Sequence, residues 1–153
     1  MRLYLIRHGE AGQAPRDSLR ELTREGRART QHNAAAVLPR LVTPATTIIA
    51  SPLARARQTA AIIHGVWNPE AALVVDDCLV PDSSPEAVAR FVDALPDQAW
   101  PLVLVGHQPL FGSLLAWLCD RPELANTVTT SSISALDLIT FGQGCATLDW
   151  QVA

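Results

Sequence analysis

The chain alternates short apolar runs with longer segments of mixed polarity. Four runs of four or five residues, rich in Leu, Ile, Val, Thr and Ala, predict strands at residues 3–6, 46–50, 71–75 and 102–105. The runs at 3–6 and 102–105 are typical of buried strands. Two further strands are expected on either side of Gly142-Gln143-Gly144, because such a glycine-bounded turn favours an antiparallel hairpin at a sheet edge.

The segments between these runs carry helix signals. One helix is expected to begin at Thr23 and to end near Pro39. Ser51-Pro52 and Ser84-Pro85 each combine a good N-cap residue with a proline, which fits the first helical position. Apolar residues recur at helical spacing after both pairs, and another helix is predicted from Pro109.

This order of elements predicts the fold class. Strands that alternate with helices indicate an α/β fold, a three-layer α/β/α sandwich with a mainly parallel sheet. The chain has 153 residues, close to the usual size of one domain, and we expect a single domain over residues 1–153.

Basic and imidazole side chains follow several of the predicted strands. His8 and His107 each come directly after an apolar strand, Arg7 precedes His8, and Arg55 lies in the first turn of the helix after Ser51. Because ligands bind beyond the carboxyl ends of parallel strands, we expect these residues to converge. Arginine matches phosphate geometry, and a neutral imidazole can attack phosphorus. The set is a candidate phosphoryl-transfer site that needs no metal and no cofactor. The polar loop at residues 12–19 is expected to contact the substrate.

Composition and charge argue against several other classes of protein. The net charge is −3, so nothing points to nucleic acid or an anionic membrane as a partner. No apolar run reaches the length of a membrane-spanning helix. The three cysteines include no Cys-x-x-Cys pair, which favours free thiols in a reducing compartment and predicts a cytoplasmic protein.

Three segments carry a resemblance to a known family. Arg7-His8-Gly9, the segment at residues 51–60 (SPLARARQTA) and Val105-Gly106-His107 resemble, in order, the three sequence blocks of the histidine phosphatase superfamily, which includes phosphoglycerate mutase. The whole chain is similar to its SixA-type phosphohistidine phosphatases. The resemblance implies a minimal phosphoglycerate mutase-like fold without cap insertions. It also implies that His8 is the nucleophile and that Arg7, Arg55 and His107 hold the phosphoryl group.

The chain departs from many relatives at the proton donor. They carry an acidic residue shortly after the third strand, where this sequence places Cys78. Asp77, Asp82 and Glu10 are candidate substitutes. An alkoxide leaving group needs a general acid, whereas an imidazole is protonated near neutral pH, so a site without a strong acid suits a P–N bond.

Three functions follow from these residues. The first is a phosphatase that removes phosphate from phosphohistidine on a protein, for example a histidine-containing phosphotransfer domain. The second is a phosphatase of small phosphate esters that uses one of the nearby acids. The third is a non-catalytic phosphate-binding module, which would have no need of a nucleophile.

Overall fold

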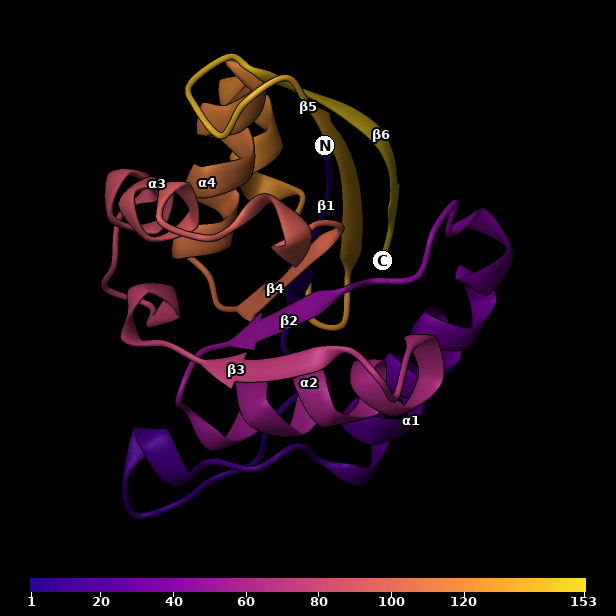
Figure 1. Cartoon of the computed structure of the whole chain (residues 1–153). Coiled ribbons are helices and arrows are strands. Elements are labelled where there is room, and N and C mark those ends of the chain that lie inside the picture. Colours follow the sequence, from indigo (N-terminus) through magenta and orange to yellow (C-terminus); the bar gives the residue numbers. More distant parts are fainter.

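The computed structural model describes residues 1–153 and contains a six-stranded sheet with helices on both faces (Figure 1). The strands are β1 (Arg2–Arg7), β2 (Thr47–Ala50), β3 (Ala72–Val75), β4 (Leu102–Gly106), β5 (Ile133–Leu138) and β6 (Ala146–Val152). Their order across the sheet is β3-β2-β4-β1-β5-β6. The first four in this order are parallel, and β5 is antiparallel to both β1 and β6. The expected edge hairpin and mainly parallel sheet are therefore confirmed.

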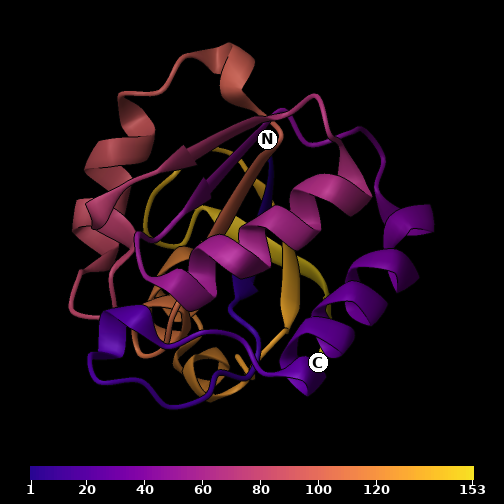
Figure 2. The ribbon, with the colours of Figure 1, turned by 90° about the horizontal axis from the view of Figure 1, so that it is seen from below.

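Four helices complete the sandwich. They are α1 (Arg24–Ala36), α2 (Ala54–Trp67), α3 (Pro85–Asp93) and α4 (Leu110–Cys119). Helices α1 and α2 cover one face of the sheet, as the view in Figure 2 shows, and α3 and α4 cover the other. None of these helices combines the length and the hydropathy that a membrane crossing requires.

Successive side chains of the central strands supply two separate cores. In β1, Leu3 and Leu5 pack with the helices α3 and α4, whereas Tyr4 and Ile6 pack with α1 and α2. All four are fully buried, because helices cover both faces of the sheet at its centre, whereas the edge strand β3 is exposed along its length. This double burial explains why β1, β2 and β4 appear in the sequence as continuous apolar runs.

Two helices begin where the sequence predicts, at Thr23 and at the predicted cap Ser84. The Thr23 hydroxyl accepts the N–H of Gly26 at the start of α1, and the Ser84 hydroxyl accepts the N–H of Ala87 at the start of α3. Helix α1 ends at Ala36, earlier than expected, and a short 3₁₀ turn (Leu38–Arg40) follows. Pro39 in that turn lacks an N–H and disfavours helical backbone in the residue before it.

The predicted cap at Ser51 is wrong. Helix α2 begins at Ala54, and Leu53 occupies its N-cap position without a side-chain hydrogen bond. The Ser51 hydroxyl lies 2.7 Å from Nε2 of His107 instead. The serine is fully buried, and its hydroxyl contacts the histidine that follows β4 rather than the first turn of α2.

Candidate active site

The two predicted site histidines lie side by side where neighbouring parallel strands end. Strands β1 and β4 pair with Arg7 opposite Gly106, and the N–H of His8 donates to the carbonyl of Gly106 at 3.0 Å. The imidazole centroids of His8 and His107 are 5.0 Å apart. The expected convergence of these strand ends is thus present, although the two histidines are 99 positions apart in the sequence.

The hydrogen bonds of His8 fix its tautomer. Its Nδ1 lies 2.7 Å from the carbonyl oxygen of Gly9, which can only accept, so Nδ1 carries the proton. On the other side of the ring, Nε–H of Arg55 points at His8 Nε2 from 3.4 Å. In the neutral ring Nε2 therefore carries the lone pair and accepts this weak hydrogen bond, in a side chain that is 8% exposed.

Both imidazoles resist protonation. Burial lowers the pKa of His8 to about 4. The hydrogen bond to the Gly9 carbonyl opposes this effect, and the positive charges of Arg55, Arg7 and Arg20 reinforce it. Burial lowers the pKa of His107 to about 3, helped by the charges of His8 and Arg55. Both rings are consequently neutral at physiological pH, as an attacking nitrogen must be.

Two arginines contribute positive charge to this strand edge. Arg55, on the first turn of α2, is buried and contacts His8 directly. Arg7, at the end of β1, donates from Nη1 to the carbonyl of Val128 at 3.1 Å. Its Nε is buried without a hydrogen-bond partner, and burial lowers the pKa of this guanidinium.

His107 is held by a residue whose role the sequence did not indicate. The Ser51 hydroxyl accepts the N–H of Leu53 at 3.3 Å and can donate to His107 Nε2 at 2.7 Å. The other ring nitrogen, Nδ1, is buried and makes no hydrogen bond within the chain. The signal for Ser51 was its place directly after β2, at the same edge of the sheet as His8 and His107.

Neighbouring elements hold the His8 segment on both sides. Thr59 in α2 accepts the N–H of Gly9 at 3.1 Å and donates to the carbonyl of Arg55 at 2.8 Å. The N–H of Ser131 donates to the carbonyl of His8 at 3.1 Å. Ser131 adopts a left-handed backbone with φ of 59°, uncommon for a non-glycine residue. The site is thus built on backbone fixed by α2 and by the segment before β5.

None of the candidate proton donors makes a hydrogen bond to these side chains. Glu10 accepts a hydrogen bond from the Thr23 hydroxyl at 3.0 Å, and the exposed carboxylates of Asp77 and Asp82 make no hydrogen bond within the chain. Cys78 packs against the apolar core beneath α3 and α4. Burial, together with the Asp76 carboxylate, raises the pKa of its thiol to about 12.

The carboxylate that does reach the site is Asp17, which the sequence did not single out. It belongs to a short 3₁₀ turn (Asp17–Leu19) in the polar loop expected to contact substrate. Its Oδ2 accepts from Nη2 of Arg55 at 3.1 Å and its Oδ1 from Nη1 of Arg20 at 3.2 Å. Burial alone would raise the pKa of Asp17, but hydrogen bonds from Arg20 and Arg55 hold it below its usual range.

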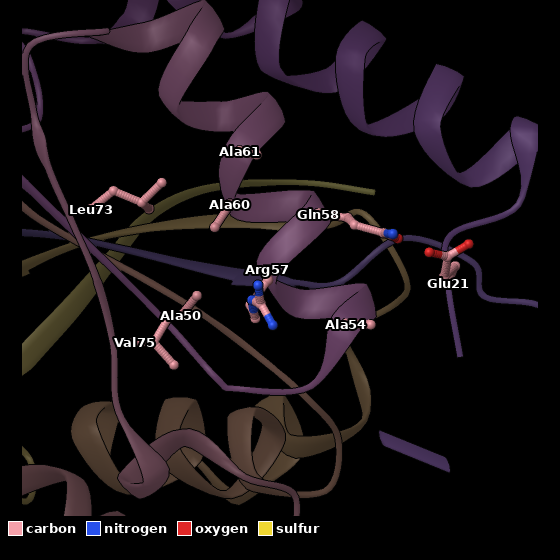
Figure 3. Close-up of a pocket in the computed structure, with 9 residues that line it drawn as sticks. All are labelled: Glu21, Ala50, Ala54, Arg57, Gln58, Ala60, Ala61, Leu73 and Val75. Carbon is pink, nitrogen blue, oxygen red and sulfur yellow. The ribbon is translucent and has the colours of Figure 1, made fainter. Parts of the chain in front are cut away.

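A groove of about 590 Å³ lies beside α2, between this helix and the edge strand β3 (Figure 3). Its lining residues are mostly small or aliphatic: Glu21, Ala50, Ala54, Arg57, Gln58, Ala60, Ala61, Leu73 and Val75. None of the four predicted site residues lines it. The groove is therefore separate from the His8 cluster, although both lie along helix α2.

The side chains of the structure offer no metal centre. No group of three or more His, Cys, Asp or Glu residues is arranged to hold an ion. The charged groups around His8 that contact it or shift its pKa are arginines, which suit an anion.

Comparison with known proteins identifies the family of the chain. Residues 3–80, a segment that holds Arg7, His8 and Arg55, match the model of the histidine phosphatase superfamily (branch 1). The chain is 33% identical to phosphohistidine phosphatase SixA of Escherichia coli (strain K12) over 156 aligned positions, which cover 100% of the chain and 94% of that protein.

Solved structures extend the comparison to the fold. The structure of the protein histidine phosphatase SixA complexed with tungstate superposes with a TM-score of 0.86 at 31% identity, covering 100% of this chain and 97% of that one. A mycobacterial glucosyl-3-phosphoglycerate phosphatase shares the fold, with a TM-score of 0.70 at 21% identity and 97% of each chain covered. On the strength of the family match and the full-length similarity, the chain is a phosphatase that belongs to the histidine phosphatase superfamily.

Proposed function

We propose that the chain hydrolyses phosphohistidine on a protein, through a covalent phosphohistidine intermediate on His8. The observation that carries the proposal is the state of His8. Its Nδ1–H is committed to the Gly9 carbonyl, and its Nε2 lone pair faces Arg55 from 3.4 Å. A neutral, oriented nitrogen beside a guanidinium is what an in-line attack on a phosphoryl group requires.

The reaction has two displacements at phosphorus. In the first, the lone pair of His8 Nε2 forms a P–N bond while the P–N bond to the substrate imidazole breaks, and that imidazole takes a proton from solvent. In the second, water attacks the same phosphorus and releases a proton to solvent, the bond to Nε2 breaks, and inorganic phosphate leaves. The nucleophile returns to its neutral state after each cycle.

The neighbouring groups suit the charge on the transferred phosphoryl group. Arg55 and Arg7 supply guanidinium donors, and Arg7 Nε has no partner within the chain. With the Ser51 hydroxyl donating to His107 Nε2, the proton of His107 resides on Nδ1, which then donates to a phosphoryl oxygen. These three side chains bind the equatorial oxygens in the proposed transition state.

The same arrangement favours a P–N bond over an alkyl ester. The nearby carboxylate, Asp17, accepts hydrogen bonds from two arginines and is ionised, so it cannot protonate an alkoxide. An imidazole leaving group has a conjugate acid with a pKa of about 6.5 and needs less assistance.

Similarity to phosphohistidine phosphatase SixA supports a protein as the carrier of the phosphohistidine, such as a histidine-containing phosphotransfer domain. Three free, half-buried cysteines fit the reducing cytoplasm as the site of action.

A substrate panel tests the proposal. We expect kcat/KM at one pH to fall from phosphoimidazole to p-nitrophenyl phosphate to an alkyl phosphate, and a histidine-phosphorylated phosphotransfer protein to exceed phosphoimidazole. If the alkyl ester reacts fastest, a general acid operates and the function is that of a small-ester phosphatase. If the phosphoprotein is no better than phosphoimidazole, the protein part of the proposal is wrong. If nothing is hydrolysed while phosphate still binds, the chain is a binding module.

A further inference from the structure

Asp17 accepts two hydrogen bonds from the guanidinium of Arg55. Nη1 of Arg55 donates to the backbone carbonyl of Asp17 at 2.9 Å, and Nη2 donates to its carboxylate Oδ2 at 3.1 Å. One residue thus binds both terminal nitrogens of the guanidinium. Arg55 is 5% exposed, whereas the side chain of Asp17 is 62% exposed, so the pair joins a buried guanidinium to a carboxylate at the protein surface.

The remaining donors of Arg55 then face the nucleophile. A guanidinium is planar, with five N–H bonds in fixed directions, so holding its end edge fixes the direction of its side edge. That side edge consists of Nε–H and the second N–H of Nη2. The structure places Nε 3.4 Å from Nε2 of His8, the atom that carries the phosphoryl group in the proposed intermediate.

Asp17 is itself held in place by Arg20. Nη1 of Arg20 donates to Oδ1 of Asp17 at 3.2 Å, and the N–H of Arg20 donates to the Asp17 carbonyl at 3.2 Å. The Arg20 side chain also reaches back to the carbonyl of Gly12 at 2.8 Å. The 3₁₀ turn that carries Asp17 has no buried residue, so these polar contacts rather than a hydrophobic core position the carboxylate.

The base of the loop is fixed independently of this network. Ala11 and Leu22 form an antiparallel bridge, and the N–H of Gly12 donates to the carbonyl of Glu21 at 2.8 Å. Removing the Asp17 side chain should therefore change the contacts of Arg55 without unfolding the loop.

We infer that Asp17 is a positioning residue, which orients Arg55 so that its side edge binds the phosphoryl group on His8. This inference rests on the proposed role of His8 and adds a residue that acts through Arg55 without touching the substrate. The carboxylate also balances one of the positive charges that gather around His8.

A double-mutant cycle in Asp17 and Arg55 tests the inference. We expect Asp17→Ala to lower kcat by about tenfold while KM and the melting temperature stay unchanged, because misdirected donors weaken the transition state more than the ground state. Asp17→Asn keeps an oxygen acceptor for Nη2 and should recover part of the loss. In an Arg55→Ala background, Asp17→Ala should have no further effect, since residues that act through one another are not additive.

Three features keep the test decisive. Glu21→Ala, which removes an exposed carboxylate from the same loop, is the matched control and should retain wild-type kcat. If turnover by the Arg55→Ala variants is too slow to measure, the same double-mutant cycle is built from the vanadate affinities of the four proteins. The cycle is measured with both p-nitrophenyl phosphate and phosphoimidazole. If the preference for P–N substrates proves wrong, the coupling between Asp17 and Arg55 can still be measured with the aryl ester, so the two hypotheses fail independently.

Two results would overturn the inference. Tighter vanadate binding by Asp17→Ala would mean that the carboxylate competes with phosphate for Arg55. An equal loss of activity from Asp17→Ala in the presence and in the absence of the Arg55 side chain would mean that the carboxylate acts elsewhere.

Discussion

Among single residues, His8 combines a committed Nδ1 with an Nε2 lone pair that faces a guanidinium. We predict that His8→Ala lowers kcat by at least about a hundredfold, about 2.7 kcal/mol of activation free energy. The fold should persist, because His8 lies outside both apolar cores. Wild-type protein quenched during turnover should carry an acid-labile, base-stable phosphoryl label that the variant lacks.

The control for this experiment is His32→Ala, which removes an exposed histidine and should change neither turnover nor label. Circular dichroism and thermal melting check that the His8→Ala variant is folded. A folded His8→Ala variant with more than a hundredth of wild-type kcat, by the same estimate of about 2.7 kcal/mol, would rule out the covalent role.

The low pKa values of the two site histidines affect stability as well as catalysis. Unfolded histidine titrates near pH 6.5, whereas burial and neighbouring arginines lower the pKa of folded His8 to about 4. Between these values the unfolded chain binds protons that the native chain does not. We therefore predict that the free energy of unfolding is highest above about pH 6.5 and falls as the pH decreases toward 5.

Urea denaturation at pH 7.5, 6 and 5 measures this effect, and NMR titration of the imidazole carbons measures its origin. The His8→Ala variant should lose less stability over the same pH range, because one of the two contributing rings is gone. Titration of His8 near pH 6.5 in the folded protein would contradict the prediction.

The sequence identified site residues that stand directly beside a strand end, and it missed those that depend on a contact. Arg7, His8 and His107 follow apolar runs, so their shared edge can be predicted from the pattern alone. Asp17 lies in a polar loop, and its pairing with Arg55 exists only once that loop folds back over α2. Nothing in the local sequence separates Asp17 from the other acidic residues.

Among the elements, helix α1 packs unusually close to the segment that follows His8. A Cβ on Gly26 would overlap the carbonyl oxygen of Glu10 and lie 2.9 Å from its nitrogen. We predict that Gly26→Ala destabilises the protein by about 1–3 kcal/mol, because helix and strand end must separate. It should also lower kcat, since Glu10 is two residues from His8. Urea denaturation and steady-state kinetics measure the two effects.

Gly65 in helix α2 offers a matched control, because a Cβ there meets no atom within 4 Å. Gly65→Ala should stabilise the protein by about 0.5–1 kcal/mol through helix propensity alone and leave kcat unchanged. If both substitutions stabilise the protein equally, the close packing of α1 against the His8 segment is not a constraint.

The two Ser-Pro pairs show where element prediction reaches its limit. Ser84 caps α3 as its sequence indicates, with its hydroxyl 3.2 Å from the N–H of Ala87. Ser51 has the same local pattern, but His107 lies 2.7 Å from its hydroxyl, and α2 begins at Ala54 instead. Local pattern determines which groups can cap a helix, and tertiary contacts decide which of them do.

For the whole molecule, alternating strands and helices were enough to predict an α/β sandwich, but not the order of its strands. The chain order does not show that β4 lies between β1 and β2, and that insertion is what brings His107 beside His8. The site is therefore a property of the topology as much as of its motifs.

The positive charge of the whole site disfavours a metal ion near His8. Arg7, Arg55 and Arg20 all lower the pKa of His8 by their positive charge, and the same field repels a divalent cation while attracting phosphate. We predict that dialysis against EDTA leaves kcat/KM for p-nitrophenyl phosphate unchanged, and that adding Mg²⁺ or Zn²⁺ gives no increase. Dialysis without chelator is the control. Activity lost on chelation and restored by either ion would show that a cation, rather than the guanidinium groups, neutralises the transferred phosphoryl group.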